Sequence, residues 1–72
     1  MLQNGRRYLF MTLGYFYSGI VESWSPGHAI LSDARIHCGD VGKLEDFDFN
    51  KGNKLKFGYI VPLPGTGVCP LD

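Results

Sequence analysis

Short apolar segments separated by turn residues run along the whole chain. Nowhere do apolar residues recur over three turns at the i, i+3, i+4, i+7 spacing of an amphipathic helix. Several segments instead alternate between apolar and polar positions, which is typical of strands with one buried face. This pattern predicts four main strands, over Arg7–Leu13, Phe16–Trp24, His28–Ile36 and Lys54–Val61.

Turn signals connect these strands. Ser25-Pro26-Gly27 combines a residue that fixes φ with one that accepts positive φ, so the second and third predicted strands should form a hairpin. Asn50–Asn53 is a second turn signal. Between them, His37–Lys43 is a Gly-rich connection, and Leu44–Phe47 fits either one helical turn or a short fifth strand at the sheet edge.

The alternation also assigns side chains to the two faces of a strand. In the third predicted strand, Ile30 and Ala34 belong to the face we expect to be buried. The residues that alternate with them belong to the outer face, namely Ala29, Leu31, Asp33 and Arg35. Gly19, in the middle of the second strand, permits a sharp bend. The fold class we expect is therefore mainly β, a small, strongly bent antiparallel sheet or partly open barrel of four or five strands.

The chain of 72 residues has the length of one small domain. We expect a flexible N-terminus over 1–6, a β core over 7–61 and an irregular tail over 62–72, where three prolines and two glycines fall. A domain this small buries only about 60% of the surface that its unfolded chain exposes. We therefore expect it to gain stability by assembling with copies of itself as a homo-oligomer.

Composition excludes several classes of protein. The hydrophobic content of 44% is too high for a disordered chain, and seven basic residues against seven acidic ones give a net charge of zero. A protein that coats nucleic acid with positive charge is therefore not expected. The chain shows neither an apolar run of about 20 residues nor a signal peptide, so we expect no membrane partner and a location in the cytoplasm.

Motifs for catalysis or metal binding are incomplete. The segment Gly39–Lys43 lacks both the first glycine of a phosphate-binding Walker loop and the Ser or Thr that follows its lysine. No chelating pair is formed by the spacing of the possible zinc ligands, which are His28, His37, Cys38 and Cys69. We expect no metal, no cofactor and no enzymatic activity. We also expect the cysteines to be free thiols, and the alternative is a Cys38–Cys69 disulfide.

The aromatic residues are the best candidates for function. Four aromatic residues lie close together in the chain, namely Tyr15, Phe16, Tyr17 and Trp24. One side of a small sheet cannot bury all of them. We expect Tyr17 or Trp24 to stack on the base of a small nucleotide, Arg35 to pair with its phosphate, and His37 and Asp40 to bind its polar edges. In the alternative interpretation, Tyr17 and Trp24 pack on the neighbouring strand.

One set of positions resembles the first motif of Sm-like proteins: Gly14, Tyr17, Gly19, Val21, Leu31, Asp33 and Ala34. This resemblance implies a bent, Sm-like barrel. The segment that would carry uridine recognition is replaced by Ser25–Ala29, so the RNA site of that family is missing here. An Sm-like RNA-binding ring is therefore only a further alternative for the function.

A closer resemblance is to a family of short phage and prophage proteins. Its blocks are matched in order by Tyr17-Ser18-Gly19, Val21, Leu31–Ala34 and Asp40–Leu44. The resemblance implies a phage-encoded anti-defence protein in the host bacterial cytoplasm. It would sequester a cyclic nucleotide or cyclic ADP-ribose signal between subunits, without catalysis. The chief alternative is a protein-protein interaction module, either an inhibitor of a host defence enzyme or a small virion component.

Overall fold

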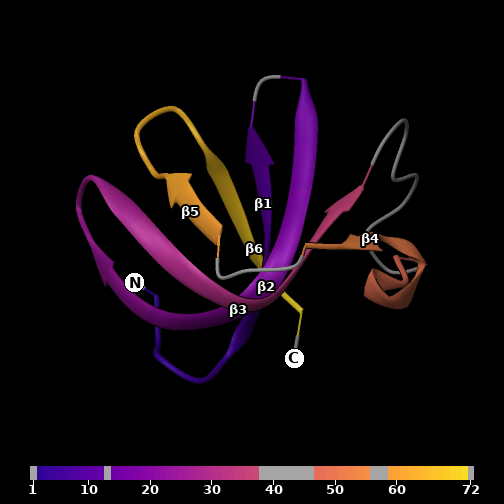
Figure 1. Ribbon diagram of the computed structural model, residues 1–72. Coiled ribbons are helices and arrows are strands. Elements are labelled where there is room, and N and C mark those ends of the chain that lie inside the picture. The colour runs from indigo at the N-terminus through magenta and orange to yellow at the C-terminus, as the bar shows by residue number, and fades with distance from the viewer. Residues whose placement is uncertain (1, 13, 38–46, 56–58, 72) are drawn as a thin grey trace.

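The computed structural model describes residues 2–12, 14–37, 47–55 and 59–71. These residues form one antiparallel sheet of six strands with a single short 3-10 helix, η2 (Phe49–Lys51) (Figure 1). The strands are β1 (Arg7–Thr12), β2 (Tyr15–Ser25), β3 (His28–His37), β4 (Asn53–Lys54), β5 (Tyr59–Pro62) and β6 (Gly67–Pro70). The sheet is bent and does not close into a barrel, so the expected small, bent, mainly β fold is confirmed.

The strand order is β4-β3-β2-β1-β6, and β5 pairs with β3 outside this path. Strands β2 and β3 form a long hairpin that turns at Pro26-Gly27, as the sequence predicts. The prediction of a single strand over Lys54–Val61 is wrong, because this region contributes to two strands. Strand β4 pairs with Arg35 and Ile36 near the end of β3, whereas β5 pairs with residues 28–31 at its start.

Two irregularities in the β2–β3 pairing explain the bend. From the pair Ser18–Arg35 to the pair Ile20–Ser32, β2 advances by two residues and β3 by three, so β3 carries one extra residue. Within that extra stretch, Asp33 adopts a φ of 47°. A second register shift follows on β2 between Val21 and Ser23. Bulges of this kind increase the local twist and bend the strand.

Because of the bulge at Asp33, the predicted assignment of side chains to the two faces of β3 is partly wrong. Ala29 and Leu31, expected on the outer face, are buried, and Ala34 on the face expected to be buried is buried as well. One extra residue reverses the alternation of side chains, so both sets reach the same core. That core is a cluster of Tyr8, Phe10, Val21, Ala29, Leu31, Ala34 and Val61.

The C-terminal tail is not irregular throughout. Its residues 67–70 form β6, which pairs with β1 in the register Tyr8–Pro70 to Met11–Gly67. The prolines explain why the sequence pattern did not predict this strand, but a proline is tolerated on a strand at the edge of a sheet. The half-buried Cys69 on β6 is a free thiol, and Cys38 lies outside the described residues.

The segment before β1 is tied to the sheet by backbone hydrogen bonds. Gly5 N donates to Val21 O at 2.7 Å, and Val21 N donates to Arg6 O at 3.0 Å. Gly5 has a φ of 86°, a conformation that favours glycine and lets the chain turn into β1. These contacts place residues 2–6 against one side of the bent sheet. Across the described part of the chain, no helix has the length and apolar character needed to span a membrane.

Candidate functional site

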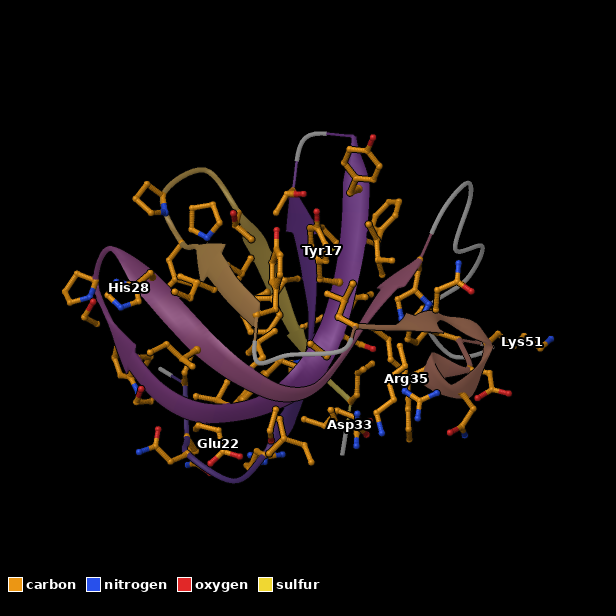
Figure 2. The ribbon with its side chains drawn as sticks, in the orientation of Figure 1. Tyr17, Glu22, His28, Asp33, Arg35 and Lys51 are labelled. Carbon is orange, nitrogen blue, oxygen red and sulfur yellow. The ribbon has the colours of Figure 1, made fainter. Side chains whose placement is uncertain are left out.

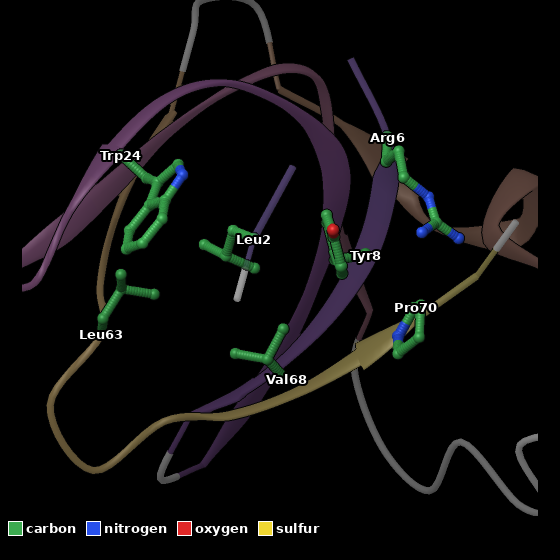
Figure 3. Close-up of a pocket in the computed structure, with 7 residues that line it drawn as sticks. All are labelled: Leu2, Arg6, Tyr8, Trp24, Leu63, Val68 and Pro70. Atoms are coloured by element: carbon green, nitrogen blue, oxygen red, sulfur yellow. The ribbon is translucent and has the colours of Figure 1, made fainter. Parts of the chain in front are cut away.

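A pocket of about 450 Å³ opens between the N-terminal segment, β1, the end of β2 and β6 (Figure 3). This volume lies within the range of about 300–1,000 Å³ that is usual for small-molecule sites. Its lining is mostly apolar and consists of Leu2, Arg6, Tyr8, Trp24, Leu63, Val68 and Pro70. The pocket therefore has the size and the apolar walls of a small-ligand site.

The aromatic rings of Trp24 and Tyr8 stand on different sides of the pocket, with Leu2 between them in the view of Figure 3. Among the described residues that line the pocket, Arg6 is the one charged side chain. Arg6 Nη1 donates a long hydrogen bond of 3.4 Å to Gln3 Oε1, which keeps the guanidinium near the N-terminal segment. In the view of Figure 3 the Arg6 guanidinium lies beyond Tyr8, away from Trp24, so a ligand that reaches both would have to span the pocket.

The position of Tyr8 follows from its contacts. Its ring is part of the core and packs at a tilt against Phe10, with centroids 6.2 Å apart. Its hydroxyl accepts a hydrogen bond of 2.8 Å from Gln3 N. Since Gln3 directly follows Leu2 in the chain, this bond helps to fix the N-terminal wall of the pocket.

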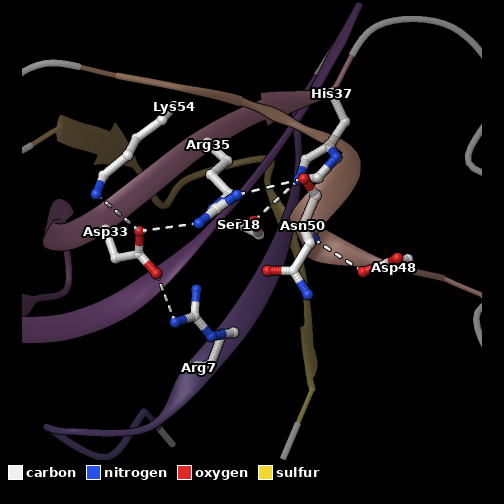
Figure 4. A network of polar contacts seen from close by, with 8 residues as sticks. All are labelled: Arg7, Ser18, Asp33, Arg35, His37, Asp48, Asn50 and Lys54. Atoms are coloured by element: carbon white, nitrogen blue, oxygen red, sulfur yellow. Dashed lines mark hydrogen bonds and ion pairs between the residues drawn. The ribbon is translucent and has the colours of Figure 1, made fainter.

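A second feature is a polar cluster around Asp33, formed with Arg7, Arg35 and Lys54 (Figure 4). Arg7 Nη2 lies 2.7 Å from Asp33 Oδ2. Arg35 Nη2 and Lys54 Nζ lie 3.4 Å and 3.7 Å from the other oxygen, Oδ1. The hydrogen bond from Arg7 is the largest of the effects that lower the pKa of Asp33, and partial burial opposes it.

The helix η2 is attached to this polar cluster. The Arg7 guanidinium lies 4.1 Å from the centre of the Phe49 ring, and that of Arg35 lies 6.0 Å from it. Arg35 Nη1 also donates to Asn50 O at 3.3 Å. Asp48 caps the start of the helix, since its carboxylate accepts a hydrogen bond from Asn50 N at 2.9 Å. The two arginines thus join η2 to the sheet.

His37 is a buried structural residue. Its Nε2 shares a hydrogen bond of 2.9 Å with Ser18 Oγ, and its ring packs against Phe47 with centroids 4.8 Å apart. Burial lowers the pKa of His37, and the charge of Arg35 lowers it further. Ser18 has no exposed surface, so this Ser–His pair cannot contact a substrate as a nucleophile and its base.

The five residues proposed from the sequence have different environments. Trp24 lines the pocket, whereas Tyr17 stacks on Tyr59 with centroids 4.6 Å apart and ring planes 21° apart. Arg35 belongs to the polar cluster, His37 is buried, and Asp40 lies outside the described residues. Figure 2 shows Tyr17 inside the bend of the sheet and Arg35 on its outer side.

One chain does not bring Trp24 and Arg35 together. Trp24 pairs with Ala29, and Arg35 pairs with Ser18, which is six positions from Trp24 along β2. Six positions correspond to about 20 Å along an extended strand. Among the described residues, Arg6 is the cation that lines the same pocket as Trp24.

Sequence reasoning missed most of the pocket lining. Val68 and Pro70 reach the pocket because β6 pairs with β1, a contact between distant parts of the chain that the tail pattern does not indicate. Arg6 could have been linked to Tyr8 from the sequence, because residues two positions apart in an extended chain lie on the same face. The pocket and the polar cluster are defined by the geometry of this chain. Comparisons with protein-family models, curated proteins and solved structures found no match for it.

Proposed function

We propose that this protein is a non-catalytic binding module that sequesters a small nucleotide-type ligand in the pocket beside Trp24. The observation that carries the proposal is the combination of Trp24, Tyr8 and Arg6 in the lining of one pocket. The ligand has a planar base and at least one phosphate. These are the two groups that aromatic rings and a guanidinium bind.

These contacts supply part of the free energy that binding requires, and the rest must come from the apolar walls of the pocket. Stacking of a base on an aromatic side chain contributes about 1–3 kcal/mol, and a hydrogen bond to a charged group about 1.5–3 kcal/mol. The apolar side chains of Leu63 and Val68 add contacts along the base and sugar. In this proposal the ligand shares the pocket with Leu2 or displaces it.

The chemistry of the lining supports sequestration over turnover. Among the described residues that line the pocket there is no carboxylate, imidazole, thiol or aliphatic hydroxyl. General acid-base and nucleophilic catalysis depend mainly on such groups. A protein that binds and retains its ligand lowers the free ligand concentration by mass action.

Self-association is part of the proposal. Tyr15 is 51% exposed and Ile60 on β5 is 60% exposed, both high values for large apolar side chains. Burying them against sister copies would stabilise a chain of 8.0 kDa. The phage-encoded anti-defence role, with a cyclic nucleotide or cyclic ADP-ribose signal as the ligand, rests on the resemblance of Tyr17–Gly19 and Leu31–Ala34 described above.

A second candidate function is a protein-protein interaction module, and the exposed Ile60 favours it. Among the described residues, β5 pairs only with β3, so its other edge offers backbone groups for pairing. Exposed edges of this kind accept a strand from a partner protein. In that case the partner would be a protein such as a defence enzyme.

Thermal unfolding in the presence of candidate ligands separates these functions. Cyclic dinucleotides, cyclic ADP-ribose and AMP are added over a concentration range, and a binder gains stability as the ligand concentration rises. We expect Arg6→Gln to weaken binding about tenfold, which corresponds to the loss of one charged hydrogen bond. Lys51→Gln, which removes an exposed charge on η2, should leave binding unchanged. A Tm that no nucleotide shifts at any concentration would contradict the proposal.

A further inference from the structure

We propose that Arg35 and Lys54 form a second site, which binds the phosphate group of a small anion at the polar cluster around Asp33. This site is separate from the pocket beside Trp24. Arg7 and Tyr8 are successive residues of β1 and therefore point to opposite faces of the sheet. Arg7 belongs to the polar cluster and Tyr8 to the pocket, so the two sites lie on different faces.

The cluster carries more positive than negative charge. Three cations, Arg7, Arg35 and Lys54, contact the single carboxylate of Asp33. Three positive charges and one negative charge leave an excess of two among these four groups. On the neighbouring helix, the exposed Asp48 and Lys51 carry opposite charges that cancel.

The distances show which cations are poorly matched. Arg7 takes Asp33 Oδ2 at 2.7 Å, within the range of about 2.7–2.9 Å for charged hydrogen bonds. Arg35 and Lys54 share the other oxygen at 3.4 Å and 3.7 Å, well beyond that range. One carboxylate oxygen therefore serves two cations that come from adjacent strands, β3 and β4.

The remaining donors of Arg35 are also weakly used. Its Nη1 bond to Asn50 O is long, at 3.3 Å. Its buried Nε has no hydrogen-bond partner among the described residues. A buried donor without a partner is unfavourable. The two Nη groups, whose contacts are long, are therefore the donors that an added acceptor would meet.

A phosphate fits these two side chains by geometry and by access. Its oxygens can accept from the fork of Arg35 and from the ammonium of Lys54 at the same time. The Lys54 side chain is 66% exposed, so the site can be reached from solvent. Arg7, held by Asp33 and by the ring of Phe49, supplies positive potential behind it.

Titration with inorganic phosphate and with pyrophosphate tests this site. Amide chemical shifts of Arg35 and Lys54 are followed by NMR, with sodium chloride added to hold the ionic strength constant. We expect saturable shifts at both residues and about tenfold weaker binding in Lys54→Gln, the loss of one charged contact. Lys51→Gln removes a lysine from η2, outside the cluster, and should bind like the parent chain.

Two further arms separate this site from other sources of binding. With AMP, shifts at Arg35 and Lys54 without shifts at Trp24 would place a nucleotide-borne phosphate in the cluster alone. Arg6→Gln should leave the phosphate-induced shifts at Arg35 and Lys54 unchanged, so this second site can stand if the pocket proposal fails. Absence of saturation at constant ionic strength, or equal losses in Lys54→Gln and Lys51→Gln, would overturn the proposal.

Discussion

Arg7 and Asp33 are 26 positions apart in the chain and are joined by a hydrogen bond of 2.7 Å between Nη2 and Oδ2. The bond passes over β2, because the strand order places β2 between β1 and β3. Asp33 reaches Arg7 from the bulge of β3, where its φ of 47° is tolerated better by Asp and Asn than by most residues. The bulge therefore bends the sheet and also positions the carboxylate at the centre of the polar cluster.

Replacing Asp33 should destabilise the fold. Asp33→Ala leaves Arg7 and Arg35 without their carboxylate and puts a residue without a local hydrogen bond at positive φ. We expect a loss of about 1–3 kcal/mol in the free energy of unfolding, measured with urea, since the pair is only partly buried. Asp33→Asn, which tolerates the same backbone, should lose less.

Glu22→Gln is the matched control, because Glu22 is an exposed carboxylate on β2. Its effect should stay within about 0.5 kcal/mol. Equal stability of Asp33→Ala and Glu22→Gln would show that the polar cluster does not stabilise the fold.

Stability should fall as the solution becomes acidic, and His37 sets the first step. The pKa of folded His37 lies below its ordinary value of 6.5, so below pH 6.5 the unfolded chain takes up the proton first. The free energy of unfolding is thus highest above pH 6.5 and decreases as the pH falls toward the folded pKa. Urea titrations carried out at a series of pH values between about 7.5 and 5 measure how the free energy of unfolding changes with pH.

Variants assign that slope to one histidine. His37→Gln should be less stable overall and should lose the pH dependence in this window. His28→Gln, at an exposed position of the β2–β3 turn, should keep it. A parent slope that survives in His37→Gln would contradict the assignment. At lower pH, protonation of Asp33 removes a second contribution, because its folded pKa is lowered below 3.8.

A side chain at Gly52 should disturb the buried His37. A Cβ at this position would overlap the His37 ring, which is confined by Ser18 and Phe47. We expect Gly52→Ala to lower the free energy of unfolding by about 1–3 kcal/mol, as overpacked sites do. Gly27→Ala is the control, because a Cβ there meets no atom within 4 Å. If both variants unfold at the same urea concentration, His37 has room that the structure does not show.

The exposed Ile60 should contribute to self-association. We expect sedimentation velocity to find a species heavier than the 8.0 kDa chain, and Ile60→Asp to shift it toward the monomer, because a charge opposes burial at an apolar interface. Asn4→Asp introduces the same charge at another exposed position and should not change the mass. A parent chain that sediments as a monomer at high concentration would contradict this prediction.

Local patterns predicted the elements that depend on neighbouring residues. The hairpin at Pro26-Gly27 was predicted from its turn residues, although Gly27 does not adopt the positive φ on which that argument relied. Gly19 lies in β2 at the first register shift, where β3 approaches closely. A Cβ at Gly19 would lie 3.0 Å from Leu31 Cβ. The extra residue at Asp33 was not predicted, because an alternating pattern carries no signal for a bulge. That one residue reversed the faces of Ala29 and Leu31.

The candidate site was predicted only in part, since it depends on contacts between distant segments. Trp24 does line a pocket, but Arg6 and β6 complete that pocket instead of Arg35. Arg35 was expected on the outer face, and there it contacts Asp33 and the ring of Phe49. The pairings that create both sites join residues far apart in the sequence, and the alternation of apolar residues does not encode them.

Trp24 is the single tryptophan of the chain, so its fluorescence reports the pocket directly. The most direct measurement is an equilibrium titration of this fluorescence with cyclic dinucleotides, cyclic ADP-ribose and AMP. We predict saturable quenching by a nucleotide as its base stacks on the indole, with affinity reduced about tenfold in Arg6→Gln. Fluorescence that changes with none of these ligands, or equally in the parent and Arg6→Gln, would contradict the account.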